Sequence, residues 1–122
     1  MKSRQELKRN YLERVKPAGV FQVKNTITSK LLLGSTLNLD GALNGHRFSL
    51  TIGAHRTPAL QHDWNSSGPD AFTFEVLEVV KISDSPYFNL SDELTLLEQI
   101  WIEQLQPFGE RGYNTNAKIR QA

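Results

Sequence analysis

The 122-residue chain has no cysteine. A disulfide and a zinc site built on thiolates are therefore both excluded. The absence also fits a reducing compartment, and we expect a cytoplasmic protein. No apolar run approaches the roughly 18 residues of a membrane-spanning helix, so no membrane partner is expected. The first residues are charged and polar with no apolar stretch behind them, which argues against a secretory signal.

Several catalytic signatures are also missing. The chain has no Gly-x-Ser-x-Gly turn, no glycine-rich loop that would cradle a nucleotide phosphate, and no Cys/His pair. His55 and His62 lie on either side of a proline and lack the spacing of a recognised metal-binding pair. The sequence therefore argues against a serine hydrolase, a nucleoside-triphosphate enzyme and a zinc enzyme.

Charge is distributed unevenly, although the net charge is only +1. Residues 1–30 carry eight Lys or Arg and two acidic residues, whereas residues 63–110 carry ten acidic residues and one basic residue. A basic end can steer a polyanion such as DNA or RNA. Lys8 and Arg9 near the N-terminus and Lys118 near the C-terminus are the candidate contacts. The alternative is a solvated helix face without a specific partner.

The apolar pattern predicts one small α+β domain. A capping box from Ser3 to Glu6 opens a basic N-terminal helix within residues 1–18, ahead of a main domain at residues 19–122. In the main domain we expect strands at residues 20–24, 30–33 and 71–80, and helices that begin near residues 36–38, 57 and 91. Two consecutive strands and one later strand predict a three-stranded, mostly antiparallel sheet flanked by helices.

Two polar residues fall on the apolar stripes of expected helices. Glu98 lies four residues after Leu94 and three before Trp101, where a carboxylate is costly to bury unless something binds it. Mg²⁺ or Mn²⁺ is one such partner; the alternative is a glutamate that reaches water or a basic neighbour. His46 shares a helix face with apolar residues. It is a candidate general base or phosphate contact, or else a core histidine bonded to the backbone.

Short motifs in a fixed order carry a family resemblance. They are Gly19-Val-Phe21; Leu32-Leu-Gly34 after ten intervening residues; His46; the segment around Glu98; and Gly112-Tyr113-Asn114. Across residues 19–114 this order resembles the GIY-YIG nuclease family, in the branch related to phage homing endonucleases. The matched positions are the Gly-Ile-Tyr and Tyr-Ile-Gly motifs, a histidine, a metal-binding glutamate and a closing motif.

The resemblance implies phosphodiester cleavage. In that family a tyrosine activates the nucleophile, an arginine steadies the phosphate, and one divalent metal on the glutamate stabilises the leaving oxygen. For this chain it implies Mg²⁺ or Mn²⁺ at Glu98, nucleic acid as the partner with DNA foremost, and a nucleic-acid contact from Asn114.

Three of the catalytic side chains of the family are replaced. Phe21 and Leu32 stand at the two tyrosine positions and Ala42 at the arginine position; Arg47 substitutes only if the helix start is shifted. Losing one well-placed donor costs roughly 10²–10³ in rate. The chain is then a nucleic-acid-binding domain with weak or absent cleavage, a protein-interaction module that kept only the fold, or an active nuclease using His46 as base and Arg47 as clamp. Whether it is an enzyme stays open.

Overall fold

The computed structural model describes residues 3–4 and 16–115. The elements are β1 (Gly19–Asn25), β2 (Leu31–Thr36), α2 (Leu39–Thr51), α3 (Pro58–Ser67), β3 (Phe72–Val79) and α4 (Leu90–Leu105), with 3₁₀ turns at Pro69–Ala71 and Gly109–Arg111. Most of the expected N-terminal helix, with Lys8 and Arg9, lies outside the described residues, as does Lys118. Within the described part of the chain, no helix is both long and apolar enough to cross a bilayer.

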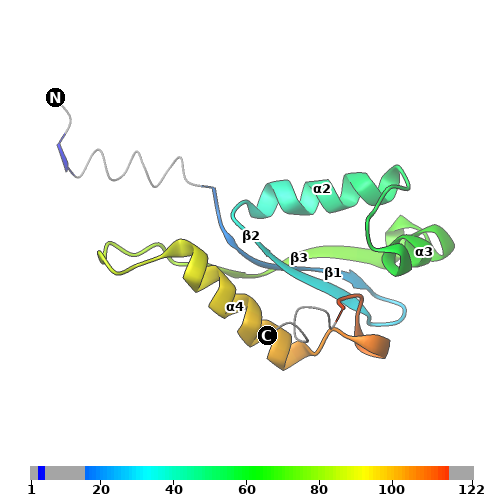
Figure 1. Ribbon diagram of the computed structural model, residues 1–122. Helices are drawn as coiled ribbons and strands as arrows, with labels where there is room; N and C mark the ends of the chain where they lie inside the picture. Colours follow the sequence, from blue (N-terminus) through cyan, green and yellow to red (C-terminus); the bar gives the residue numbers. More distant parts are fainter. Residues whose placement is uncertain (1–2, 5–15, 116–122) are drawn as a thin grey trace.

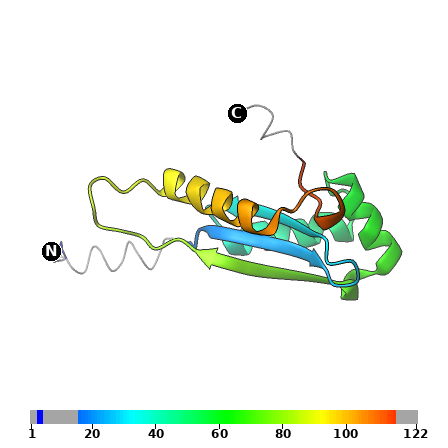
Figure 2. The same cartoon turned by 90° about the horizontal axis from the view of Figure 1, so that it is seen from below.

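β1 is the central strand of an antiparallel sheet with the order β2-β1-β3. It suits the centre because apolar side chains point to both of its faces, and Val20 and Val23 are both fully buried. Figure 1 shows α2 and α4 on opposite faces of the sheet, and Figure 2, seen from below, shows α4 lying across the sheet. The expected α+β fold with three antiparallel strands is confirmed.

Each face of the sheet has its own apolar cluster. On the α2 and α3 face the buried members are Val23, Leu50, Leu60, Trp64, Ala71, Phe72 and Tyr113. On the α4 face they are Val20, Leu31 and Leu33, against which Leu77, Leu97, Trp101, Ile102 and Leu105 pack. The expected apolar stripe of α4 therefore covers the sheet, and its position decides which α4 side chains reach the edge of β2.

Asparagine side chains cap the two long helices. Asn38 accepts a hydrogen bond from the N–H of Gly41 at 3.1 Å, and α2 begins immediately after it. Asn89 accepts from the N–H of Asp92 at 3.0 Å, so α4 begins at Leu90. The helix thus begins slightly earlier than the expected start near residue 91, because Asn89 provides the capping oxygen.

Candidate active site

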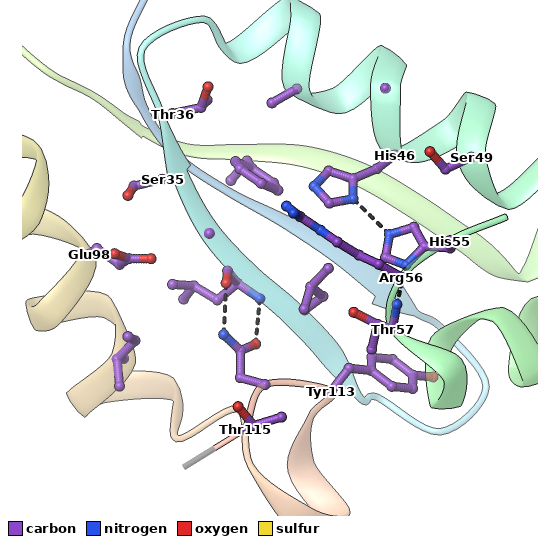
Figure 3. A pocket seen from close by; sticks show the side chains of 18 of the residues that line it. Ser35, Thr36, His46, Ser49, His55, Arg56, Thr57, Glu98, Tyr113 and Thr115 are labelled. Atoms are coloured by element: carbon purple, nitrogen blue, oxygen red, sulfur yellow. Dashed lines mark hydrogen bonds between the residues drawn. The ribbon is translucent and has the colours of Figure 1, made fainter. Parts of the chain in front are cut away.

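An open groove of about 1100 Å³ crosses the outer edge of β2, between α2 and α4. Sites for small molecules measure ~300–1,000 Å³, so the groove is slightly larger than a typical small-molecule site. It is lined from β1, β2, α2, the segment 54–57, α4 and the segment 108–115. Figure 3 shows Glu98 on one side of β2 and His46, His55 and Arg56 on the other. The groove therefore brings together the two polar residues that the sequence pattern singled out, Glu98 and His46.

Glu98 reaches the groove from α4, with Leu97 and Trp101 beside it packed on the sheet. No hydrogen bond or ion pair holds its carboxylate among the described residues. The same residues contain no group of three or more His, Asp or Glu that would enclose a metal. A single carboxylate still suits Mg²⁺, which keeps several waters and binds through one or two carboxylates plus substrate phosphates. Glu98 thus fits a metal shared with a phosphate ligand and does not fit a metal enclosed by protein alone.

His46 and His55 form a hydrogen-bonded pair on the other side of β2. Nδ1 of His46 lies 2.8 Å from Nε2 of His55. The backbone N–H of Thr57 donates to Nδ1 of His55 at 3.0 Å, and a backbone N–H only donates. Neutral His55 therefore carries its proton on Nε2 and donates it to His46. Neutral His46 then carries its own proton on Nε2, on the side of the ring away from His55 (Figure 3).

Burial and positive charge keep both rings neutral near pH 7. Desolvation lowers the pKa of His46 most, and His55 and the Arg56 guanidinium lower it further. Desolvation also lowers the pKa of His55, again with help from Arg56. His46 consequently offers an N–H donor, since its Nδ1 lone pair already accepts from His55. This suits a phosphate contact better than a general base. The alternative of a core histidine bonded to the backbone is wrong, because its partner is another ring.

The guanidinium that enters the groove belongs to Arg56, which sequence reasoning missed. Figure 3 shows its side chain running from the segment before α3 toward His46, and it lines the groove. The sequence carries no pattern that would single out Arg56, because it stands in a loop without periodicity. His55 was likewise missed as a partner of His46, since nothing in the spacing predicts that the loop folds back onto α2.

Arg47 is exposed on α2 and does not line the groove. Its guanidinium carbon lies 4.2 Å from the centre of the Phe74 ring, which is a cation–π contact. A role as the phosphate clamp required a shifted helix start, but the Asn38 cap on Gly41 sets the start of α2. Ala42 occupies the groove-lining position instead.

The two motif positions that lack tyrosine lie on the α2 side of the sheet. The ring of Phe21 is 5.2 Å from the ring of His46, and Phe21 is only 4% exposed. A Cβ added to Gly34 would come within 2.7 Å of the Phe21 ring, so glycine at position 34 lets the ring lie directly on β2. Leu32 is half-buried against the core cluster. Neither Phe21 nor Leu32 carries a hydroxyl that could be ionised.

Tyr113 lines the groove but does not replace the missing tyrosines. Its hydroxyl donates to Oδ2 of Asp63 at 2.7 Å and accepts from Nδ2 of Asn25 at 3.2 Å. Burial, with the Asp63 carboxylate adding to it, raises the pKa of Tyr113 to about 12. The side chain is therefore a protonated phenol at neutral pH, and its proton is already directed at a carboxylate.

Asn114 covers part of the outer edge of β2. Its amide oxygen accepts from the N–H of Leu33 and its amide nitrogen donates to the carbonyl of Leu33, both at 2.8 Å. The side chain thus satisfies both backbone groups of one edge residue, as a neighbouring strand would. The hydrogen bonds of Asn114 hold the edge of β2 in place. Because Asn114 also lines the groove, a direct contact with nucleic acid stays a prediction.

The chain is similar to Intron-associated endonuclease 1 of Enterobacteria phage T4, at 30% identity over 97 residues. The match covers 80% of this chain and 36% of that protein, so the chain spans about a third of that relative's length. Two solved structures are also similar. The catalytic domain of the homing endonuclease I-TevI is 30% identical with a TM-score of 0.62, over 80% of this chain and 96% of that chain. A point mutant of the catalytic domain of intron endonuclease I-TevI is 28% identical with a TM-score of 0.64, over 80% and 92%. No protein-family profile matches the chain.

The fold and the site together define an α+β domain of the nuclease type. The defining features are a small antiparallel sheet, a groove across its edge strand, and a glutamate on the helix that follows the last strand. The chain belongs to the GIY-YIG nuclease family, as a homing-endonuclease-like domain. The resemblance drawn from the short motifs of the sequence is thereby confirmed.

Proposed function

We propose that this domain acts on DNA by binding its phosphodiester backbone in the groove, with weak or absent cleavage. Family membership supports nucleic acid as the partner. The observation that carries the proposal is a groove that retains His46 and Glu98 while Phe21, Leu32 and Ala42 occupy the tyrosine and arginine positions. Such a site keeps groups that hold a phosphate and lacks groups that would activate a nucleophile.

Each retained residue has a role that its geometry supports. The Nε2–H of His46 donates to a phosphate oxygen, because its Nδ1 is occupied by His55. Glu98 would hold Mg²⁺ or Mn²⁺ together with water and the phosphate. When bound, the ion supplies positive charge beside a leaving oxygen. Lys8, Arg9 and Lys118 would add backbone contacts that weaken as salt rises.

Weak cleavage follows from what the groove lacks. Phe21 and Leu32 have no hydroxyl, and Tyr113 stays protonated at neutral pH. His46 would have to break its bond to His55 before its Nδ1 could take a proton from water. Each missing group costs roughly 10²–10³ in rate, so several losses leave little activity. A rearranged active nuclease with Arg47 as clamp finds less support, because that side chain packs on Phe74.

A protein-interaction module is the second candidate function. The observation that favours it is the charge of residues 63–110, which carry ten acidic residues and one basic residue. This segment includes α4 and would repel a nucleic-acid backbone over part of the surface.

Equilibrium binding of short duplex DNA at low salt separates the two candidates. We expect binding that weakens with salt, and an affinity lowered about tenfold by His46→Ala, the cost of losing a hydrogen bond to a charged group. His62→Ala is the matched control, since His62 is exposed and does not line the groove. No detectable binding at low salt would reject the proposal and direct attention to protein partners.

A further inference from the structure

Arg56 is the positive charge of the groove to which no role has been given. It lines the groove together with His46 and Ala42, and Figure 3 shows its guanidinium near the His46 ring. We infer, resting on the proposed function, that Arg56 and the Nε2–H of His46 together bind one phosphodiester group of the nucleic-acid backbone. Arg56 then supplies, from the loop before α3, the charge that α2 lacks at Ala42.

The backbone on both sides of Arg56 is held in place. The N–H of His55 donates to Oε1 of Gln61 at 3.0 Å, and the N–H of Thr57 donates to the His55 ring at 3.0 Å. Nε2 of Gln61 donates in turn to the carbonyl of Leu50 at 3.1 Å, which ties the loop to the end of α2. Little backbone entropy is left to lose when Arg56 takes hold of a ligand, and such preorganisation favours binding.

Small residues on α2 leave room for the Arg56 side chain. Ala42 and Gly45 both line the groove. A Cβ added to Gly45 would meet nothing within 4 Å, so this wall of the groove is open rather than packed. α2 places no cation in the groove, and it faces the space into which the side chain of Arg56 extends.

The charge of Arg56 is available to a ligand. Its side chain is exposed, and no carboxylate of the described residues forms an ion pair with it. Its guanidinium lies close enough to the histidine pair to add to burial in lowering the pKa of both His46 and His55. A guanidinium binds two oxygens of one phosphate at once, and the neutral His46 N–H supplies a third donor. Because the proposed contact is made to a phosphate and not to a base edge, it is independent of nucleotide sequence.

The test titrates the full chain with a dinucleotide that has a single phosphodiester link. The side-chain ¹⁵N resonances of Arg56 and His46 are followed by NMR. A dinucleotide with a neutral methylphosphonate link serves as the uncharged probe. We expect both resonances to shift together and to saturate with the phosphodiester, and neither to shift with the neutral probe.

Variants of the arginine sharpen the test. Arg56→Ala should raise the Kd for the phosphodiester about 10- to 100-fold, the usual worth of a charge-assisted contact. Arg56→Lys should raise it less, because it keeps the charge and loses the two-pronged geometry. Lys81→Ala removes one positive charge outside the groove and should change the Kd less than about twofold.

The outcomes separate this inference from the proposed function. Absent shifts in the wild type, or unchanged affinity in Arg56→Ala, would overturn the phosphate-binding pair. Duplex DNA bound equally by the wild type and by Arg56→Ala would also overturn it, and the proposed function would stand. A wild type that binds the dinucleotide through Arg56 but does not bind duplex DNA would support the pair and reject the proposed function.

Discussion

Nδ1 of His46 accepts a hydrogen bond from Nε2 of His55 at 2.8 Å, and this contact decides which proton the groove presents. The direction of the bond follows from the backbone N–H of Thr57, which occupies the other nitrogen of His55. His46 is left with an N–H on the groove side and no free lone pair. In a groove without a usable tyrosine, this favours holding a phosphate over activating water.

Acid should destabilise the fold through this pair. Burial lowers the pKa of both rings, whereas the unfolded chain titrates near the ordinary value of 6.5. Below that pH the unfolded state therefore binds protons that the folded state does not. The contribution of the neutral pair to the free energy of unfolding is fully present above about pH 6.5. It is lost as the pH falls toward the lowered pKa values of the two rings in the folded state.

Urea denaturation measures this effect as the difference between the free energies of unfolding at two pH values. One is near neutral pH and the other is about one unit below the ordinary histidine pKa. The His46→Gln variant should lose less stability on acidification than the wild type. His62→Gln, at an exposed position on α3, should behave like the wild type. Identical acid sensitivity in the His46→Gln variant and the wild type would show that the pair does not carry it.

Glu98→Ala should abolish binding of Mg²⁺ or Mn²⁺ with little effect on the fold. No hydrogen bond or ion pair holds Glu98 among the described residues, so its removal should change the free energy of unfolding by less than ~0.5 kcal/mol. Calorimetric titration with Mn²⁺ in the presence of short DNA measures the loss. Glu103→Ala, an exposed position on the same helix that does not line the groove, is the matched control. Unchanged metal affinity in Glu98→Ala would remove the glutamate from the metal site.

Replacing Lys8 and Arg9 by Glu should weaken DNA binding and flatten its salt dependence. Each lost phosphate contact lowers the slope of log affinity against log salt by about 0.9, so two contacts lower it by about two. Affinities measured over a salt series give the slope directly. Lys81→Glu reverses one charge in the same way at an exposed position outside the groove and should leave the slope unaltered. The role of the N-terminal segment would be refuted by a slope that stays the same in the double variant.

Asn114→Ala should lower the free energy of unfolding by about 1–3 kcal/mol. The change removes both hydrogen bonds to Leu33 and leaves two backbone groups at the edge of β2 without a protein partner. Urea denaturation of this variant gives the loss. Asn44→Ala, at an exposed position on α2, should cost much less. Equal stabilities of the two variants would contradict the edge-holding role of Asn114.

The sheet and the position of Glu98 could be predicted because their pattern is local. Phe72 and Phe74 join the cluster on one face of the sheet and Leu77 the cluster on the other, as the alternation along β3 predicts. The position of Glu98 follows from the helical period of α4. This period buries Leu94 and places Glu98, one turn later, toward the edge of β2.

His55 and Arg56 could not be predicted because a loop positions them. Their placement depends on Gln61, whose side-chain amide forms hydrogen bonds with both the loop and the end of α2. No periodicity in the sequence predicts such a contact. The exact start of α4 could not be predicted from the sequence either. Asn89 and Ser91 both have side chains that cap helices, and only the backbone conformation selects Asn89.

The most direct measurement compares binding and nicking of supercoiled plasmid DNA in the same samples at low salt. Reactions contain Mg²⁺, Mn²⁺ or a chelator, with Glu98→Ala alongside the wild type. The account predicts that the wild type binds the plasmid and nicks it at or near the background rate. Rapid nicking that needs the metal and disappears in Glu98→Ala would contradict it, because this groove would then have to activate water without a tyrosine.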